Sequence, residues 1–213
     1  MTVNYWLALG LACSLSACTT LPVPTPAEPA TAEALWQQRQ PPLTAVQHWT
    51  VSGRLAILTP QTGWHVRIRW QQQGDAYLIQ LDAPLGQGAA ELRGDTTGVV
   101  LRTAGGEFHA ASAEDLLTQR LGWRLPAGGL HYWVRGLPDA GAAVDGLTLD
   151  AAGRLTHLQQ SGWNIEFRHY SAVPTSTSPL ALPDKIFLTH NSTPASAALD
   201  LRLVIEQWDT TPH

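Results

Sequence analysis

The sequence predicts a single α+β domain in which short helices lie on one side or end of an antiparallel sheet. Three observations lead to this fold class. Apolar and polar side chains alternate over several runs, of which residues 64–70 are the clearest. Clusters of Gly, Pro, Asn and Asp separate the runs about every ten residues, the rhythm of an antiparallel sheet or barrel. Segments with helical signals occur only before and in the middle of these runs.

Three segments are predicted to be helical. Residues 32–46 start with apolar side chains, but Pro41-Pro42 should divide this segment in two, because proline is tolerated only in the first turn of a helix. The second helix is expected over 112–122, with Ser112 as its N-cap and acidic residues in its first turn. The third is expected over 129–135 and is closed by a glycine.

The alternating runs place a set of large apolar side chains on one concave face of the sheet. One layer of sheet with three short helices leaves part of that face uncovered, and tryptophan gives a wide apolar lining, so we expect a cavity there. A filled core is the alternative. The residues expected to line the cavity are Trp64, Val66, Ile68, Trp70, Tyr77, Ile79, Leu81, Trp163, Ile165, Phe167, Leu201 and Leu203.

Composition and motifs exclude several classes of function. Charged residues make up 14% of the 213-residue chain and the net charge is −4, with no basic patch for nucleic acid. No zinc-binding spacing, phosphate-binding loop, dinucleotide fingerprint or nucleophile elbow is present, so no metal, cofactor or catalytic residue is predicted. An acid–base pair built from His109 with Glu107, or His169 with Glu166, keeps an envelope hydrolase as a weaker alternative.

The N-terminus has the features of a processing signal. Residues 1–27 carry no charged side chain, and a short apolar run leads into Leu15-Ser16-Ala17-Cys18. This end resembles a bacterial lipobox, in which the cysteine becomes the lipidated first residue; an ordinary signal peptide is the alternative. We therefore expect a signal peptide over 1–17, lipidated Cys18 with a Pro-rich tether over 18–31, and one domain over 32–213.

Several short segments follow one another along the chain in a characteristic order. They are Trp36, Gly53-Arg54, Trp70-Gln71-Gln72, Tyr77-Leu78-Ile79-Gln80-Leu81, Pro84-Leu85-Gly86, Leu121-Gly122-Trp123-Arg124-Leu125-Pro126, Tyr132-Trp133-Val134-Arg135-Gly136-Leu137-Pro138, Gly162-Trp163-Asn164-Ile165-Glu166-Phe167, Leu182-Pro183 and Trp208. In this order and spacing they resemble the LolB family of outer-membrane lipoprotein receptors. The resemblance covers the chain from the lipobox to the last strand.

The resemblance implies a fold, a set of partners and a location. It implies an incomplete antiparallel barrel of about 10–11 strands with helices covering an apolar cavity. The protein would be a monomer, without enzymatic activity, anchored by lipid on the periplasmic face of the outer membrane. It would take acylated lipoproteins from a soluble, LolA-like periplasmic carrier and insert them into outer-membrane lipid. Leu85, between Pro84 and Gly86, matches the loop leucine that delivers cargo to the bilayer; a hairpin leucine folded onto the core is the alternative.

Overall fold

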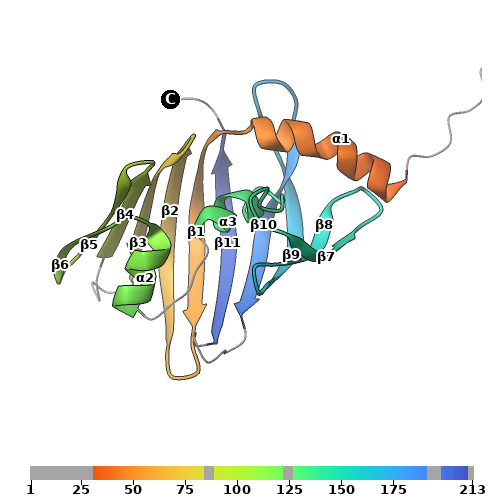
Figure 1. Ribbon diagram of the computed structural model, residues 1–213. Coiled ribbons are helices and arrows are strands. Elements are labelled where there is room, and N and C mark those ends of the chain that lie inside the picture. The colour runs from red at the N-terminus through yellow and green to blue at the C-terminus, as the bar shows by residue number, and fades with distance from the viewer. Residues whose placement is uncertain (1–30, 84–88, 122–126, 191–197, 211–213) are drawn as a thin grey trace, which may run out of the picture.

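One large sheet and three helices make up the computed structural model (Figure 1), which describes residues 31–83, 89–121, 127–190 and 198–210. The helices are α1 (Ala32–Ala45), α2 (Ala113–Leu121) and α3 (Ala127–Trp133). The strands are β1 (His48–Leu58), β2 (Gly63–Gln73), β3 (Ala76–Asp82), β4 (Ala89–Asp95), β5 (Gly98–Thr103), β6 (Gly106–Ala110), β7 (Val144–Leu149), β8 (Leu155–Gln160), β9 (Trp163–Val173), β10 (Leu180–His190) and β11 (Leu199–Asp209).

The sheet is antiparallel throughout and remains open. Its eleven strands follow the order β6-β5-β4-β3-β2-β1-β11-β10-β9-β8-β7. The first strand pairs with the last, so the two ends of the domain meet at the middle of the sheet, while β6 and β7 form its two edges. The prediction of an incomplete antiparallel barrel with short helices is confirmed.

The alternation of side chains along the strands gives the sheet a buried inner face and a solvent-exposed outer face. On β9, Trp163, Ile165 and Phe167 are buried, whereas the residues between them are partly exposed. A bulge near Gly53 increases the local bend of β1 against β11. A Cβ atom at Gly53 would lie 2.1 Å from the carbonyl oxygen of Val204, so this close approach requires glycine.

All three helices lie on the inner side of the sheet (Figure 1). The first is one continuous helix, so the prediction that Pro41-Pro42 divides it is wrong. The two prolines remove the amides that would bond to the carbonyls of Gln37 and Gln38, and both glutamines are exposed, where water can replace the lost donors. Trp36 and Leu43, both buried, anchor the helix on either side of the prolines.

A buried arginine connects α3 to the end of α1. Arg135 is 1% exposed, and its Nη1 donates to the carbonyl oxygen of Val46 at 2.8 Å. Its Nε donates to the carbonyl oxygen of His131 at 3.0 Å. Burial lowers the pKa of Arg135 from its ordinary value. These bonds to carbonyls satisfy a charge that would otherwise be expensive to bury, and they fix α3 against the start of β1.

The apolar side chains form two hydrophobic clusters. The main cluster lies under α1 and α3 and extends over strands β1, β2 and β8–β11. A second, small cluster consists of Val99, Leu101, Ala113 and Leu116 and joins α2 to β5. Tyr77 on β3 packs against both clusters. The inner face therefore has a boundary between two separately packed regions, at the strands around β3.

Candidate functional site

A pocket of about 300 Å³ lies at this boundary, between α2, α3 and the inner face of β2–β5. Its apolar wall comes from both sheet and helices. The larger apolar residues that line it are Trp70, Tyr77, Ile79, Leu92, Val99, Leu117 and Leu130. The pocket exists because each cluster packs against its own helix, and neither helix fills the space between them.

Hydrogen bonds hold the sheet side of the pocket in place. The indole Nε1 of Trp70 donates to Oε1 of Gln72 at 3.0 Å, and Nε2 of Gln72 donates to the carbonyl oxygen of Gly74 at 2.8 Å. Trp49 packs against Trp70 in a tilted arrangement, with ring centroids 4.9 Å apart. Because its polar atom is satisfied, Trp70 presents an apolar ring to the pocket.

The two helices that cover the pocket are joined directly. A carboxylate oxygen of Glu114, in the first turn of α2, accepts a hydrogen bond from the amide of Gly128 at 3.1 Å. Gly128 lies in the first turn of α3, where amides lack partners within the helix and favour a negative charge. The same helix brings His131 to the pocket, with its Nδ1 2.9 Å from the carbonyl oxygen of Gly128.

The polar groups around the pocket are mainly acidic. Asp75, Asp95 and Glu114 all contribute to its lining. Burial, reinforced by the charges of Glu114 and Asp95, raises the pKa of the Tyr77 hydroxyl to about 12, so this residue is neutral. Burial, and then the charge of Arg135, lowers the pKa of His131 below its ordinary value. The pocket thus combines an uncharged apolar interior with an acidic edge.

The residues predicted from the strand pattern fall into three groups. Trp70, Tyr77 and Ile79 line the pocket. A second group lies in or against the main hydrophobic cluster outside the pocket: Ile68, Leu81, Trp163, Ile165, Phe167, Leu201 and Leu203. Trp64 and Val66 have the same strand parity but belong to neither group, because Trp64 is 44% exposed and Val66 is partly exposed. Cys18 and Leu85, with Pro84 and Gly86, lie outside the described residues.

Four of the larger apolar residues that line the pocket were not among those predicted: Leu92, Val99, Leu117 and Leu130. The signal that could have identified Leu92 and Val99 is the alternation of apolar and polar residues in the short strands of the 89–103 region. Leu117 belongs to the apolar side of the predicted second helix. These residues come together only because α2 folds back over the sheet, and no local sequence pattern specifies this placement of the helix.

The histidine pairs considered from the sequence lie away from the pocket. Nε2 of His109 is 3.0 Å from a carboxylate oxygen of Glu107, and both side chains are largely exposed on edge strand β6. His169 pairs with Asp184 at 2.7 Å rather than with Glu166, whose carboxylate contacts Arg168. Across the described ranges, no cluster of three or more His, Cys, Asp and Glu is arranged to hold a metal ion.

The fold and the pocket place the protein in the class of open antiparallel sheets whose inner apolar face is covered by helices. A solved LolA superfamily protein from Nitrosomonas europaea has the same fold, with a TM-score of 0.53 at 8% identity, covering 86% of this chain and 95% of that chain. None of the described helices has the length and hydropathy required to cross a membrane.

Sequence comparison identifies the family within this class. Residues 47–208 match the family model described as "Outer membrane lipoprotein LolB". The outer-membrane lipoprotein LolB of Nitrosococcus oceani is 43% identical over 195 residues, 91% of each chain. That of Pseudomonas paraeruginosa is 36% identical over 209 residues, 98% of this chain and 97% of its own length. The chain belongs to the LolB family of outer-membrane lipoproteins.

Proposed function

We propose that this protein receives acylated lipoproteins from a soluble, LolA-like periplasmic carrier and inserts them into the outer membrane. The observation that carries the proposal is the apolar pocket of about 300 Å³ between the helices and the open sheet. Family membership and the LolA-type fold support the same function. The proposal contains no chemical step.

The physical need for such a receptor follows from the cost of exposing acyl chains to water. Each methylene group transferred to water costs about 0.8 kcal/mol, so two or three acyl chains cost on the order of tens of kcal/mol. A lipoprotein therefore has to pass from one apolar site to another. Transfer then runs through differences in affinity between the carrier, this protein and the bilayer.

The pocket has to enlarge to accept this cargo. A volume of about 300 Å³ lies at the lower end of the range for a single small ligand. Two or three acyl chains therefore require α2 and α3 to move relative to the sheet. The second cluster holds α2 through few buried side chains, so its displacement exposes less apolar surface than would loss of the main cluster.

Two residues outside the described ranges complete the proposal. Cys18 provides the acylated anchor, and residues 18–31 form the tether to the domain. Leu85 contacts the bilayer during release of cargo. Burial of one leucine contributes only about 1.5–3 kcal/mol, so Leu85 orients the domain and disturbs lipid packing, while Cys18 anchors it.

The decisive experiment is a transfer assay in two stages. Lipoprotein-loaded carrier is mixed with the chain from residue 18 onward bearing Cys18→Ala, which leaves residues 31–210 intact. Cargo bound to the acceptor is measured first, and cargo found in added liposomes is measured second. The proposal predicts both transfers. Failure of the first transfer, together with no binding of an apolar fluorescent probe, would instead indicate a filled core and a structural lipoprotein.

A further inference from the structure

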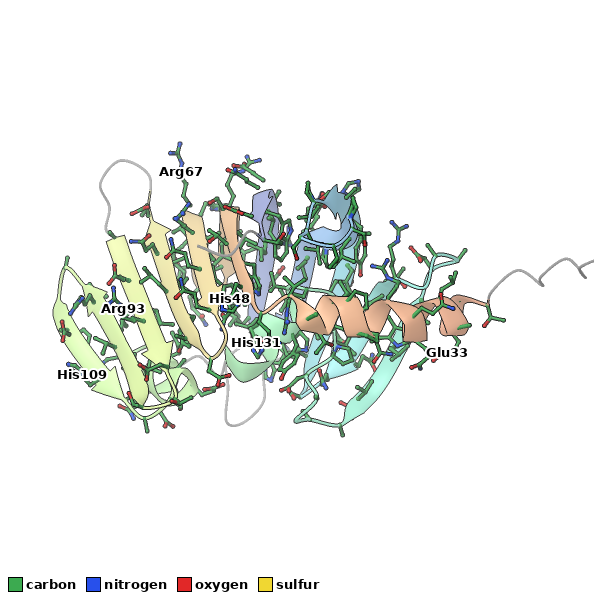
Figure 2. The ribbon with its side chains drawn as sticks, turned by 90° about the horizontal axis from the view of Figure 1, so that it is seen from above. Glu33, His48, Arg67, Arg93, His109 and His131 are labelled. Atoms are coloured by element: carbon green, nitrogen blue, oxygen red, sulfur yellow. The ribbon has the colours of Figure 1, made fainter. Side chains whose placement is uncertain are left out.

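The outer face of the sheet carries a groove that the proposed acyl pocket does not use. Two adjoining hollows, of about 770 and 670 Å³, share Arg54, Arg67 and Asp82. They follow the outer side of β1, where Ser52 and Ala56 are small and the neighbouring strands carry longer side chains. Figure 2 shows Arg67 projecting from the sheet on the side away from α1 and α3.

Arginines dominate the lining of the groove. Four of them, Arg54, Arg67, Arg69 and Arg202, line the two hollows, against the carboxylates of Asp82 and Glu206. This local excess of positive charge occurs in a chain whose net charge is −4. The field of the groove is therefore opposite to that of the acidic pocket edge on the inner face.

Two of these arginines face each other on neighbouring strands. Arg54 and Arg67 are directly opposite each other in the β1–β2 register, and like charges in such positions destabilise a sheet. Arg54 is compensated by Glu206 at 2.7 Å. Arg67 faces Asp82 on its other side, in the β2–β3 register, but takes part in no ion pair within the described part of the chain. An anion bound between the two arginines would remove the repulsion.

The floor of the groove is apolar. Ala56, Val204 and Phe187 form part of it. Three cations lie near the Phe187 ring: Arg168 at 5.2 Å, Arg202 at 5.4 Å and Lys185 at 5.6 Å from the ring centroid. Cations above an apolar floor suit a ligand that is both anionic and amphiphilic.

The position of the groove favours a membrane over an acidic peptide. Arg67 pairs in register with Asp82, and Ala83 also lines the groove, immediately before the predicted membrane segment at Leu85. Trp64 lies nearer than Arg67 to the same end of β2; strand parity places its side chain on the inner face, and it is 44% exposed. Exposed tryptophan is favoured at the level of lipid headgroups, where its ring is partly apolar and partly polar.

We propose that the arginine groove on the outer face binds the phosphate groups of anionic phospholipids, while Trp64, at the same end of the sheet, lies at headgroup level. This second contact sets the orientation of the domain on the bilayer. It rests on the proposed function, because it assumes that the end of the sheet at which β3 finishes, at Asp82, approaches the membrane during release.

The test is sedimentation with vesicles of phosphatidylglycerol and phosphatidylcholine, using the unacylated chain from residue 18 with Cys18→Ala. Binding is expected to phosphatidylglycerol vesicles and to weaken with added salt. Arg67→Gln should reduce the partition coefficient about fivefold, while Arg67→Lys keeps it. Trp64→Ser should also weaken binding, and Trp64→Phe less so. Circular dichroism establishes that each variant is folded.

Arg93→Gln is the matched control, because Arg93 is a largely exposed arginine on β4 that lines neither hollow. If Arg93→Gln changes the partition coefficient by less than twofold, the result supports a local site at the groove. If it lowers the partition coefficient as much as Arg67→Gln does, the result overturns the assignment of binding to the groove. Absence of binding to anionic vesicles, or full competition by millimolar inorganic phosphate, overturns the lipid assignment.

Transfer from loaded carrier separates this proposal from the proposed function. Arg67→Gln should accept cargo at the wild-type level, since Arg67 lies on the opposite face from the pocket. Vesicle binding without any cargo acceptance would refute the receptor function and leave the groove standing. Cargo transfer from the carrier, with no difference between phosphatidylglycerol and phosphatidylcholine vesicles, would refute the lipid-binding groove and leave the receptor function standing.

Discussion

The carboxylate of Glu114 accepts a hydrogen bond from the amide of Gly128 at 3.1 Å and thereby connects the two helices that cover the pocket. The bond joins the first turn of α2 to the first turn of α3. If the pocket opens by separation of these helices, this bond has to break for an acyl chain to enter.

Glu114→Ala is therefore expected to speed the entry of an apolar probe, by severalfold in a stopped-flow fluorescence measurement. A net hydrogen bond contributes about 0.5–1.5 kcal/mol, so stability should fall by no more than that. Glu114→Gln is the control, because its amide oxygen can still accept the bond, and it should resemble the wild type. Equal rates in all three proteins would mean that the helices do not separate at this point.

A second prediction concerns the buried amide that supports α3. Gln160 is fully buried; its Oε1 accepts from Nε1 of Trp133 at 2.8 Å and from the amide of Asp139 at 2.9 Å. Its Nε2 donates to two carbonyl oxygens of the same loop. Gln160→Leu leaves these groups without partners and should lower the free energy of unfolding by about 2–4 kcal/mol. Urea denaturation measures the loss, and Gln159→Leu, at an exposed position on the same strand, should change stability by less than about 0.5 kcal/mol.

The sequence pattern predicted the sheet well because the signal is local. Alternation in Trp163-Asn164-Ile165-Glu166-Phe167 identifies both the strand and its buried face, and the structure agrees. The rule for proline failed at Pro41-Pro42, because it takes account of lost hydrogen bonds but not of the buried anchors at Trp36 and Leu43.

The pocket was harder to predict, because it depends on distant parts of the chain. Strand parity places Trp64 and Trp70 on one face, but it does not indicate that only Trp70 lies deep enough to be buried. The contact of α2 with β5 divides the apolar residues into two clusters, and the pocket lies where they meet. Only the Trp70, Tyr77 and Ile79 positions of the predicted set lie there.

The third prediction concerns pH and His131. Burial, and then the charge of Arg135, lowers the pKa of His131 in the folded state, so the unfolded chain binds more protons in mildly acidic solution. Stability contributed by neutral His131 is present above the unfolded pKa of about 6.5 and is lost as pH falls through the lower folded pKa. Thermal unfolding between pH 7.5 and 5 should show this loss, and His131→Gln should make the dependence shallower. An unchanged slope in the variant would assign the loss to other groups.

The fourth prediction separates acceptance of cargo from its release. Leu85→Glu should leave folding and transfer from the carrier nearly unchanged, because the proposal assigns Leu85 to the bilayer. Transfer onward into liposomes should fall at least tenfold, since a carboxylate is costly to bring into hydrocarbon. Leu85→Ile, which keeps the apolar surface, should retain most of the transfer. Equal loss at both stages would show that Leu85 packs against the fold, and normal insertion would show that it has no part in release.

The last prediction tests whether acyl chains occupy the pocket at the boundary of the two clusters. Leu117 lies on α2, lines the pocket and is only partly buried, so a larger side chain at this position can extend into the cavity without displacing the sheet. Leu117→Trp should therefore occupy part of the volume of about 300 Å³ and weaken binding of an apolar fluorescent probe about tenfold, with little change in stability. Gln119→Trp adds an indole to the same helix at an exposed position and should bind the probe normally. Titration of both variants with the probe, followed by transfer from loaded carrier, distinguishes the outcomes. If Leu117→Trp binds the probe and accepts cargo as well as Gln119→Trp does, the acyl chains lie elsewhere on the inner face, and the main cluster around Ile165 would have to open instead.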